Sequence, residues 1–485
     1  MTDLQTKMLS ELKQLVTAKG LLTGKVAGFL QDSEYQLILF MIQTGNWSGD
    51  QPPPPQGFTK DSGSIELGLF LHWFNNPNEI TDTSIRPFAS AFKDAFDLPP
   101  SAVTNPNYLF YVNGNEIIYP DGTVLSMEPY ATFDQGWFVA FINLLITDVL
   151  NLWYKDSNFP QPGNPIIING AMPNVVRIAM MGDWGAGNAA SAEVMNQITN
   201  LSLPPDYIIH LGDVYYGGTP AVNDPNSGYY PESSLNEEVN NLLNCWPQGY
   251  AGKSFTLNSN HEMYSGANGL FQDALLKEGT PFYAQGGASC FALQFADWTI
   301  LGLDSAFYGT SLDAFMQGFI GDSTSVQYQW IQKINPDPSK TIVLTHHTGC
   351  NLDASQVYPL WYQLRDALGG NDPYAWYWGH AHNGIVYKQP MNIPATGYSD
   401  FFTQAFVRCN GHASLPFGEA SELLGKENVL WQASSPKPAP SKECFNGFVM
   451  LTITSYNGKV IMVDEEYYDP SSANPQWTNT IFNQI

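Results

Sequence analysis

The most regular feature of the sequence is a series of short apolar runs, each of which ends in a polar cluster. From about residue 174 onward, VVRIAMM is followed by GDWG, YIIHL by GDVYY, KSFTL by NSNHE, TIVL by THH, and AWYW by GHAH. Such runs are typical of buried strands. The stretches AASAEVMNQITNL and SVQYQWIQKI between them have a helical pattern. Together they predict an α/β layered domain with its functional site at the sheet edge where the strands end.

Two further strand pairs are expected in the same part of the chain. FALQFA and WTILGLDS follow each other closely enough to pair. GFVMLTITSYNGKVIMVDEE alternates around Asn457-Gly458, which is a strong hairpin signal. No segment repeats at a fixed period, so a repeat architecture is not indicated.

The first third of the chain has a different pattern. Residues 1–46 and 63–100 show helical periodicity, and the proline run Pro52–Pro55 between them predicts an extended surface connection. NYLFYVNGNEIIYPDGTVLSME predicts short strands joined by Asn-Gly and Asp-Gly turns, and a helix is expected around 134–154. We therefore expect a mostly helical N-terminal region at 1–165, an α-rich α+β extension of unknown role, and a catalytic domain at 170–485.

Size and charge narrow the classes of function. With 485 residues the chain exceeds the length at which one hydrophobic core usually stops growing, so two domains, or one domain with a large extension, are expected. The formal net charge of −25 argues against nucleic acid and against an anionic membrane surface as partners. A small anionic substrate stays compatible with this charge, because bound metal ions supply a strong local positive field.

The cysteines and the N-terminal sequence indicate in which cellular compartment the protein is expected. The five cysteines show no C-x-x-C spacing and predict mostly reduced, buried thiols. MTDLQTKMLSELKQL has an amphipathic pattern and lacks the apolar run of a signal peptide. The stretch from Phe138 to Tyr154 is too short and too polar for a membrane span. The interpretation is a soluble, cytoplasmic protein.

The polar clusters carry the residue types that hold a pair of metal ions. Such a pair needs oxygen donors, imidazoles and one carboxylate that bridges. The candidates at the five strand ends are Asp183, Asp213, Asn260, His346, His380 and His382. At strand spacing the last two would face opposite sides, so both must lie in the turn after Trp378.

The six candidates together indicate a metal site more strongly than any one of them does alone. A lone Gly-Asp after a strand is usually a turn, and a lone buried histidine is usually part of a core. Here, however, five of the eight histidines fall inside three of the clusters: His261, His346, His347, His380 and His382. This concentration favours a metal site over five separate structural roles.

The ordered blocks GD…GDxxY…NHE…H…GHxH resemble the calcineurin-like metallophosphoesterase superfamily and, within it, the purple acid phosphatases. The resemblance covers roughly residues 174–390. It implies a layered β-sandwich flanked by helices (αββα), and it implies hydrolysis of phosphate esters at a dinuclear metal centre.

Two positions indicate the purple acid phosphatases. Most of the superfamily has a histidine two residues after the first aspartate, where this chain has Gly185. Purple acid phosphatases instead use a tyrosine three residues after the bridging aspartate, which corresponds to Tyr216; Tyr215 is the neighbouring bystander. A phenol is a poor ligand at neutral pH, but a trivalent ion can hold it as phenolate. The resemblance thus implies Fe(III) in one site and a divalent ion (Fe, Zn or Mn) in the other.

Carried over by position, the resemblance assigns each residue a role. The first ion takes Asp183, Asp213, Tyr216 and His382, and the second takes Asp213, Asn260, His346 and His380, so that Asp213 bridges. Metal-bound hydroxide is expected to attack a phosphate monoester, with Asn260 and His261 as substrate contacts. His261 is the expected proton donor to the leaving group, with a hydrogen bond to Glu262 as its alternative role. His347 is the second candidate catalytic residue.

The sequence departs from the family pattern in two places. Ser259 precedes Asn260 where a glycine is usual, and Ser355 and Gln356 stand where a further active-site histidine is usual. Proton delivery therefore depends on His261, with His347 as the other candidate. The segments PLWYQL and DPYAWYW are interpreted either as apolar walls for a leaving group or as core.

Two alternatives to a phosphate monoesterase stay open on the sequence alone. One is a phosphodiesterase or nucleotidase of the same superfamily that uses Mn or Zn, without Tyr216 as a ligand. The other is a catalytically inactive metal-binding interaction module, against which the complete ligand set argues. The expected partner is a small phosphate-ester substrate, and the oligomeric state is left open.

Overall fold

The structure is a computed structural model in which side chains are present. It describes residues 73, 76–80, 86, 111–113, 116–118, 124–126, 130, 134–150, 152–154, 159–221, 232–311, 314–394, 400–415, 423–437 and 443–484. The helices expected at 1–46, most of the helical stretch at 63–100 and the proline run lie outside the described residues.

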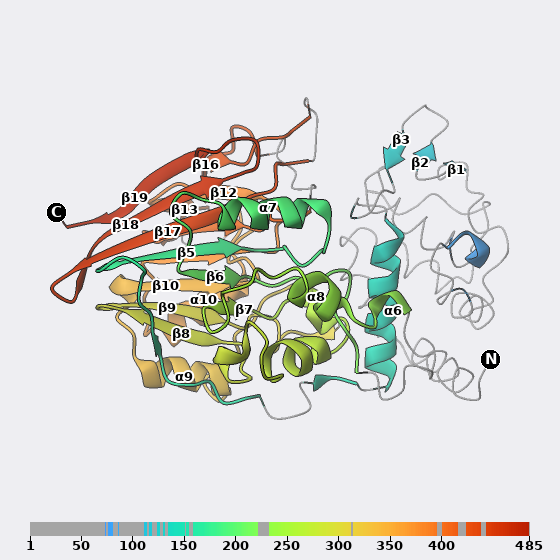
Figure 1. The fold of residues 1–485 in the computed structure, drawn as a ribbon, viewed down its shortest axis with the longest axis horizontal. Helices are drawn as coiled ribbons and strands as arrows, with labels where there is room; N and C mark the ends of the chain where they lie inside the picture. Colours follow the sequence, from blue (N-terminus) through green and yellow to red (C-terminus); the bar gives the residue numbers. More distant parts are fainter. Residues whose placement is uncertain are drawn as a thin grey trace.

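Two mixed sheets form the body of the molecule (Figure 1). The six-stranded sheet has the order β19-β18-β17-β5-β6-β7. Its strands are β5 (Val175–Met181), β6 (Tyr207–His210), β7 (Ser254–Thr256), β17 (Phe448–Tyr456), β18 (Lys459–Tyr468) and β19 (Trp477–Asn483). β5, β6 and β7 run parallel, whereas β17 to β19 add to this sheet antiparallel.

The eight-stranded sheet has the order β16-β12-β15-β11-β10-β9-β8-β4. Its strands are β4 (Ile166–Ile167), β8 (Phe291–Phe295), β9 (Trp298–Leu303), β10 (Thr341–Thr345), β11 (Ala375–Trp378), β12 (Gly384–Tyr387), β15 (Phe406–Asn410) and β16 (Val429–Gln432). A separate two-stranded sheet pairs β13 (Met391–Ile393) with β14 (Phe401–Thr403). The expected pairing of FALQFA with WTILGLDS is confirmed as the antiparallel pair β8–β9.

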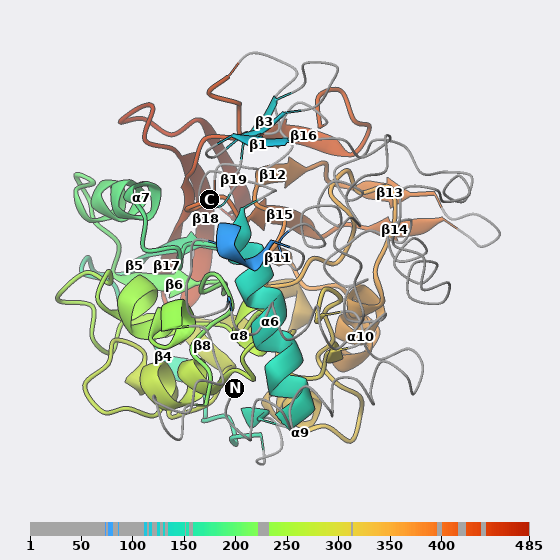
Figure 2. The same ribbon diagram turned by 90° about the vertical axis from the view of Figure 1, so that its right-hand side faces the viewer.

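Helices flank the sheets and also cross one end of them. The described helices are α6 (Gln135–Leu150), α7 (Ala189–Thr199), α8 (Asn260–Met263), α9 (Val326–Ile334) and α10 (Pro359–Ala367). Single turns of 3-10 or π type occur at Pro77–Glu79, Glu232–Ser234, Glu238–Leu243, Leu270–Leu275, Tyr283–Gln285 and Pro338–Lys340. The two predicted helical stretches are thus confirmed as α7 and α9. Figure 2 shows α6 crossing in front of the sheets, on the side where α8 lies.

The central strands of both sheets are buried on both faces. In β5, Ile178 and Met180 belong to the cluster between the sheets, whereas Ala179 and Met181 belong to the cluster under the helices. Alternate residues of a strand point to opposite faces, so burial of both faces requires a continuous apolar run. This explains why VVRIAMM lacks the polar alternation of a solvent-facing strand.

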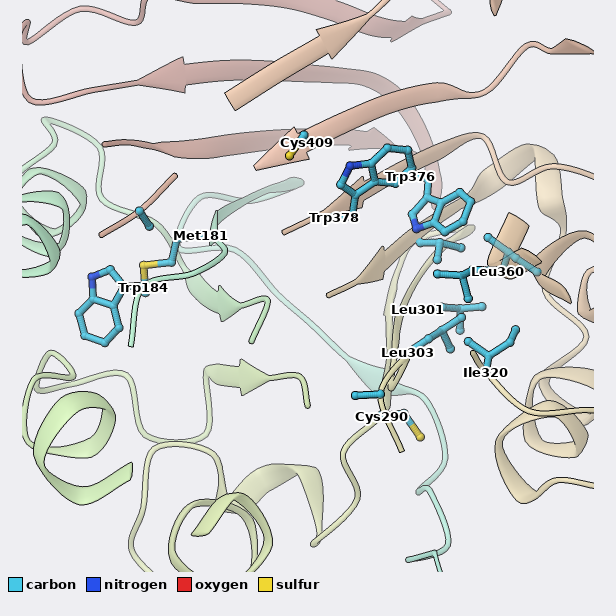
Figure 3. Close-up of a cluster of buried hydrophobic side chains, with 14 of the residues drawn as sticks. Met181, Trp184, Cys290, Leu301, Leu303, Ile320, Leu360, Trp376, Trp378 and Cys409 are labelled. Carbon is cyan, nitrogen blue, oxygen red and sulfur yellow. The ribbon is translucent and has the colours of Figure 1, made fainter. Parts of the chain in front are cut away.

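The aromatic segments near the last strands are core. Trp361, Trp376 and Trp378 are all fully buried, and their rings meet edge to face at centroid distances of 5.1–6.2 Å. Figure 3 shows Trp376 and Trp378 among the buried side chains, with Leu360 of α10 nearby. These tryptophans therefore stabilise the outer face of the sheet and do not line a leaving-group pocket.

The hairpin signals are confirmed at both ends of the described chain. β17 and β18 pair with Tyr456 opposite Lys459, and Asn457 and Gly458 between them both have positive φ. β1 (Tyr111–Asn113), β2 (Glu116–Ile118) and β3 (Val124–Ser126) form an antiparallel three-stranded sheet. The layered α/β sandwich is therefore confirmed as the fold, while the boundary near residue 165 stays a prediction.

One finding concerns membranes. Among the helices that the structure describes, none has both the length and the apolar character that a bilayer crossing requires.

Candidate metal centre

Aligned strand ends bring the polar clusters together. In the six-stranded sheet, Met181 pairs with His210 and His210 with Thr256, so β5, β6 and β7 end at one level. In the other sheet, Thr345 pairs with Trp378, so β10 and β11 also end level. The residues that follow these ends are Asp183, Asp213, Asn260, His346, His380 and His382. Because parallel strands deliver their carboxyl ends to one edge, residues up to 199 positions apart form one site.

Four of these residues adopt a left-handed backbone. The φ angles are +60° for Asp183, +80° for Asp213, +67° for His380 and +44° for His382. Such angles are uncommon for residues other than glycine, and they concentrate where the surroundings impose a conformation that function needs. The turn after Trp378 thus lets both histidines approach the site, each from its own side.

One half of the site centres on His346. Its Nδ1 lies 2.9 Å from the carbonyl oxygen of Leu211, so Nδ1 carries the proton and donates it there. Its Nε2 therefore presents a lone pair. This lone pair faces Asn260 Oδ1 at 2.9 Å, Asp213 Oδ1 at 3.2 Å and His380 Nδ1 at 3.2 Å.

The other half combines two carboxylates, an imidazole and a phenol. His382 Nε2 lies 3.3 Å from Asp183 Oδ1. The Tyr215 hydroxyl lies 2.7 Å from Asp213 Oδ2, 3.2 Å from Asp183 Oδ1 and 3.2 Å from His382 Nε2. Asp183, Asp213 and His382 bring one ligand atom each to within 4.8 Å of the others. Asp213 is shared, because its two oxygens face the two halves.

These donor sets fit a pair of cations. Around His346, a lone pair meets oxygen acceptors with no proton between them, and Asp213 Oδ1 is buried without a hydrogen-bond donor. Ligand atoms around one ion at about 2.1 Å are themselves about 3.0–3.4 Å apart. The spacings of 2.9–3.3 Å in both halves agree with that value. Mixed imidazole and oxygen donors suit Zn, Mn and Fe.

The pKa shifts of the Asp183 and Asp213 carboxylates also favour bound cations. Burial, and then the neighbouring Asp213 carboxylate, raise the pKa of Asp183 well above its usual range. Burial also acts to raise the pKa of Asp213, but the imidazoles of His261 and His346 hold it well below its usual range. Two buried carboxylates this close cannot both ionise alone, whereas bound cations would let both do so.

The structure corrects the expectation for Tyr216. Its hydroxyl does not reach the donor cluster but donates a hydrogen bond to Asp134, which precedes α6. The phenol among the carboxylates belongs to Tyr215, which is fully buried. Consecutive side chains leave the backbone in different directions, so only one of the two tyrosines can point into the site. The sequence therefore predicted a tyrosine in this cluster, but the tyrosine that lies there is Tyr215 and not Tyr216.

His261 lies beside the cluster with one ring nitrogen directed toward it. Its Nδ1 donates to the main-chain oxygen of Tyr216 at 2.6 Å. Its Nε2 lies 3.7 Å from Asp213 Oδ2, and only 6 % of the residue is exposed. The alternative bond to Glu262 is not formed, because Glu262 accepts from Ser259 instead. His261 thus presents a single exchangeable position to the site.

The family model for the calcineurin-like phosphoesterases matches residues 176–384, a span that holds every donor described above. Residues 176–384 are a calcineurin-like phosphoesterase domain. Its hydrolytic, metal-binding character follows from this family, and Asp183, Asp213 and His382 form a candidate ligand group for a metal ion.

Comparisons of the whole chain with other proteins are more distant. Among curated proteins, no sequence match was found. Among solved structures, the anchor protein GAP50 of the Plasmodium inner membrane complex shares 11% identity at a TM-score of 0.41, over 64% of this chain and 90% of that one. The purple acid phosphatase PPD1 from yellow lupin (Lupinus luteus) seeds shares 14% identity at a TM-score of 0.38, over 67% of this chain and 56% of that one. Similarity at this level carries no argument about the present chain.

His347 does not face the phosphoesterase site with a free nitrogen, which corrects its expected catalytic role. Its Nδ1 lies 2.9 Å from Ser305 Oγ and its Nε2 lies 2.7 Å from the Phe315 main-chain oxygen. The ring packs against His380 at a centroid distance of 4.9 Å. Because both nitrogens already have protein partners, His347 supports the orientation of His380 and does not exchange protons with a substrate.

Three polar residues near the site have local structural roles, and the first of them, Ser259, is a departure from the family pattern. Ser259 has φ −140° and ψ 178°, an extended backbone that needs no glycine, and its side chain caps α8 by accepting from His261 N. Asp304 accepts from the main chain of Ala306 and Phe307 and thereby anchors a loop. His210 is fully buried against Thr256, at 3.0 Å from its hydroxyl.

Some residues that brace the site escaped the sequence analysis. Asn410 Nδ2 donates to the main-chain oxygen of Met180 at 2.7 Å. Ser414 Oγ donates to the main-chain oxygen of Asp183 at 2.5 Å. Asn410 ends β15 and Ser414 follows it, in the segment CNGHAS, whose polar cluster at the end of an apolar strand matches the pattern of the other blocks. That pattern was the available signal in the sequence.

Proposed function

We propose that the phosphoesterase domain hydrolyses phosphate monoesters at a dinuclear centre that holds Fe(III) and a divalent ion. The observation that carries the proposal is the pair of donor sets that share Asp213, with a phenol in one set only. A phenol among hard oxygen donors suits a trivalent ion, and imidazole with an amide oxygen suits a divalent one.

The donors divide between the two ions. Asp183, Asp213, Tyr215 and His382 would hold the trivalent ion, and Asp213, Asn260, His346 and His380 the divalent one. When bound, the ions would act as Lewis acids toward the phosphoryl oxygens and lower the pKa of water. The remaining steps depend on side chains that the chain itself supplies.

His261 is the candidate for proton delivery. With Nδ1 fixed on the Tyr216 carbonyl, only Nε2 is available to the ester, and it can hold a proton for the leaving oxygen. Burial lowers the pKa of the His261 imidazole, so the protonated form is populated at acid pH. We therefore expect turnover of esters with poor leaving groups to fall as the pH rises toward neutrality.

The test compares two classes of ester and two variants. Protein loaded with iron and zinc should hydrolyse nitrophenyl phosphate faster than bis(nitrophenyl) phosphate. Asp213→Asn should bind metal at least about a hundredfold more weakly. Asp464→Asn is the matched control, because Asp464 lies on β18 and its carboxylate accepts a hydrogen bond from the Thr480 hydroxyl. Preference for the diester would overturn the proposed substrate class, and an unchanged metal affinity in Asp213→Asn would overturn the site.

A further inference from the structure

Tyr130 and residues 134–137, called here the 130/134–137 segment, precede the matched phosphoesterase domain and lie against its active site. Figure 1 shows α6, which begins at Gln135, running along the end of the sheets beside α8. Beyond α6, the chain stays attached to the same loops, since Tyr154 N donates to the Gly266 oxygen at 2.9 Å and Asn268 donates to the Leu152 oxygen at 2.8 Å. Residues 152–154 therefore contact the loop that follows α8, the helix that carries His261.

The contact of the segment is centred on the Tyr216 side chain. The ring of Tyr130 stacks on it at 4.8 Å, with an interplanar angle of 12°, and Trp137 meets its edge at 5.2 Å. A Cβ atom added at Gly136 would lie 2.1 Å from the Tyr216 ring. Glycine is therefore required at residue 136 for this close approach. The aromatic ring is enclosed by the segment on several sides.

Asp134 holds the hydroxyl of the same side chain. Its Oδ2 accepts from Tyr216 and also from the main-chain nitrogen of Tyr130 at 2.7 Å, and its Oδ1 accepts from Gly136 N at 3.1 Å. The carboxylate is thus fixed by its own segment before it meets the tyrosine. A preorganised acceptor of this kind restrains its partner more than a flexible one would.

Tyr216 connects this segment to the proposed proton donor. Its main-chain oxygen accepts the Nδ1 proton of His261, which leaves Nε2 directed at the metal cluster. Trp137 also contacts the His261 ring directly, at a centroid distance of 5.6 Å. A displacement of the Tyr216 backbone would therefore move the oxygen that fixes the tautomer and orientation of His261.

We propose that Asp134 is a positioning residue for catalysis: through Tyr216 it holds His261 in the orientation that delivers a proton to the leaving group. This inference rests on the proposed function, since it concerns the proton donor of that reaction. It also gives the N-terminal segment a role, namely completion of the active site of the domain that follows it.

The kinetic test uses leaving groups of different basicity. An alkyl phosphate needs protonation of its leaving oxygen, whereas nitrophenyl phosphate hardly does. Asp134→Ala and Tyr216→Phe should each lower kcat for the alkyl ester roughly tenfold to a hundredfold more than kcat for the nitrophenyl ester, with KM little changed. The double variant should be no worse than either single one, because both remove one interaction. Asp134→Asn, which keeps an acceptor, should retain most activity.

The matched control is Tyr328→Phe. Tyr328 on α9 donates to Asp366 at 2.7 Å, so this variant removes a tyrosine–carboxylate bond far from the site and should keep wild-type kinetics. Equal losses for both esters, or additive losses in the double variant, would show a merely structural role and overturn the inference. If His261→Ala itself fails to discriminate between the esters, then the proton-donor role in the proposed function is wrong as well.

A readout independent of turnover uses the metal-free protein. With nitrogen-15 in the histidine rings, the chemical shifts of His261, assigned through His261→Ala, report which nitrogen carries the proton. The wild type should show the Nδ1–H form, and Asp134→Ala a mixture of tautomers. An unchanged Nδ1–H form in both Asp134→Ala and Tyr216→Phe would overturn the inference even where kinetics suffer.

Discussion

The neighbouring tyrosines 215 and 216 provide a sharp test of the metal site. The two perturbations are Tyr215→Phe and Tyr216→Phe, which remove one hydroxyl each from adjacent positions of the same loop. The Tyr215 hydroxyl is buried and lies among Asp183, Asp213 and His382, whereas that of Tyr216 bonds to Asp134. Both variants thus remove the same chemical group. Tyr215→Phe leaves Asp213 without its hydrogen-bond donor, whereas Tyr216→Phe leaves Asp134 without one.

The magnitude follows from the hydrogen bonds of Tyr215. A phenol has one proton, and the shorter contact, 2.7 Å, assigns it to Asp213. A hydrogen bond to a charged partner contributes about 1.5–3 kcal/mol, so metal-free Tyr215→Phe should lose about 2 kcal/mol of unfolding free energy. In the metal-loaded protein the variant also lacks a donor atom, and we expect metal affinity to fall by at least roughly ten- to a hundredfold.

The assays are metal content after dialysis, the visible spectrum of the iron-loaded protein, and urea unfolding in the presence of a chelator. Burial and then the Asp183 and Asp213 carboxylates raise the pKa of Tyr215 well above its usual range in the ion-free protein, but a trivalent ion reverses this preference. A phenolate–iron band should therefore be present in Tyr216→Phe and absent in Tyr215→Phe. The opposite pattern of bands would refute the assignment of Tyr215.

Three further outcomes are expected. Gly136→Ala places a methyl group against the Tyr216 ring and should destabilise the protein by about 1–3 kcal/mol in thermal unfolding, while Gly163→Ala, where the added atom meets nothing, should not. Burial lowers the pKa of His412 to about 3, so its neutral form stabilises the fold above about pH 6.5, and this contribution is lost as the pH falls toward 3. In urea unfolding, the free energy of unfolding of His412→Gln should therefore rise relative to that of the wild type by about 1.4 kcal/mol for each unit by which the pH falls from about 6 to about 4. Parallel curves of the two proteins against pH would contradict this. Arg408→Met leaves the buried Glu465 without its guanidinium, 2.6 Å away, and should cost about 3–5 kcal/mol, with Lys340→Met, which breaks a half-exposed ion pair, as the mild control.

The sequence alone determined the strands and the polar residues that follow them. Each of the five apolar runs is a strand of the structure, because residues buried on both faces must be apolar without interruption. Parallel strands of one sheet end at a common edge, so the polar residues after β5, β6 and β7 gather there. The packing of the two sheets brings those that follow β10 and β11 beside them. The hairpin at Asn457-Gly458 was equally local, since two residues with positive φ define its turn.

Only the tertiary structure decided which nitrogen or oxygen of each residue faces the site. His347 and His346 are adjacent in sequence, yet the partners of His347, Ser305 and Phe315, come from other loops. In the same way, Tyr216 turns away from the cluster because Asp134, 82 positions earlier, accepts its hydroxyl. A sequence specifies such choices through contacts between distant segments, and these have no signature in local periodicity. That is why the residue types that gather in the candidate site could be predicted from the chain, whereas the orientation of Tyr215, Tyr216 and His347 required the fold.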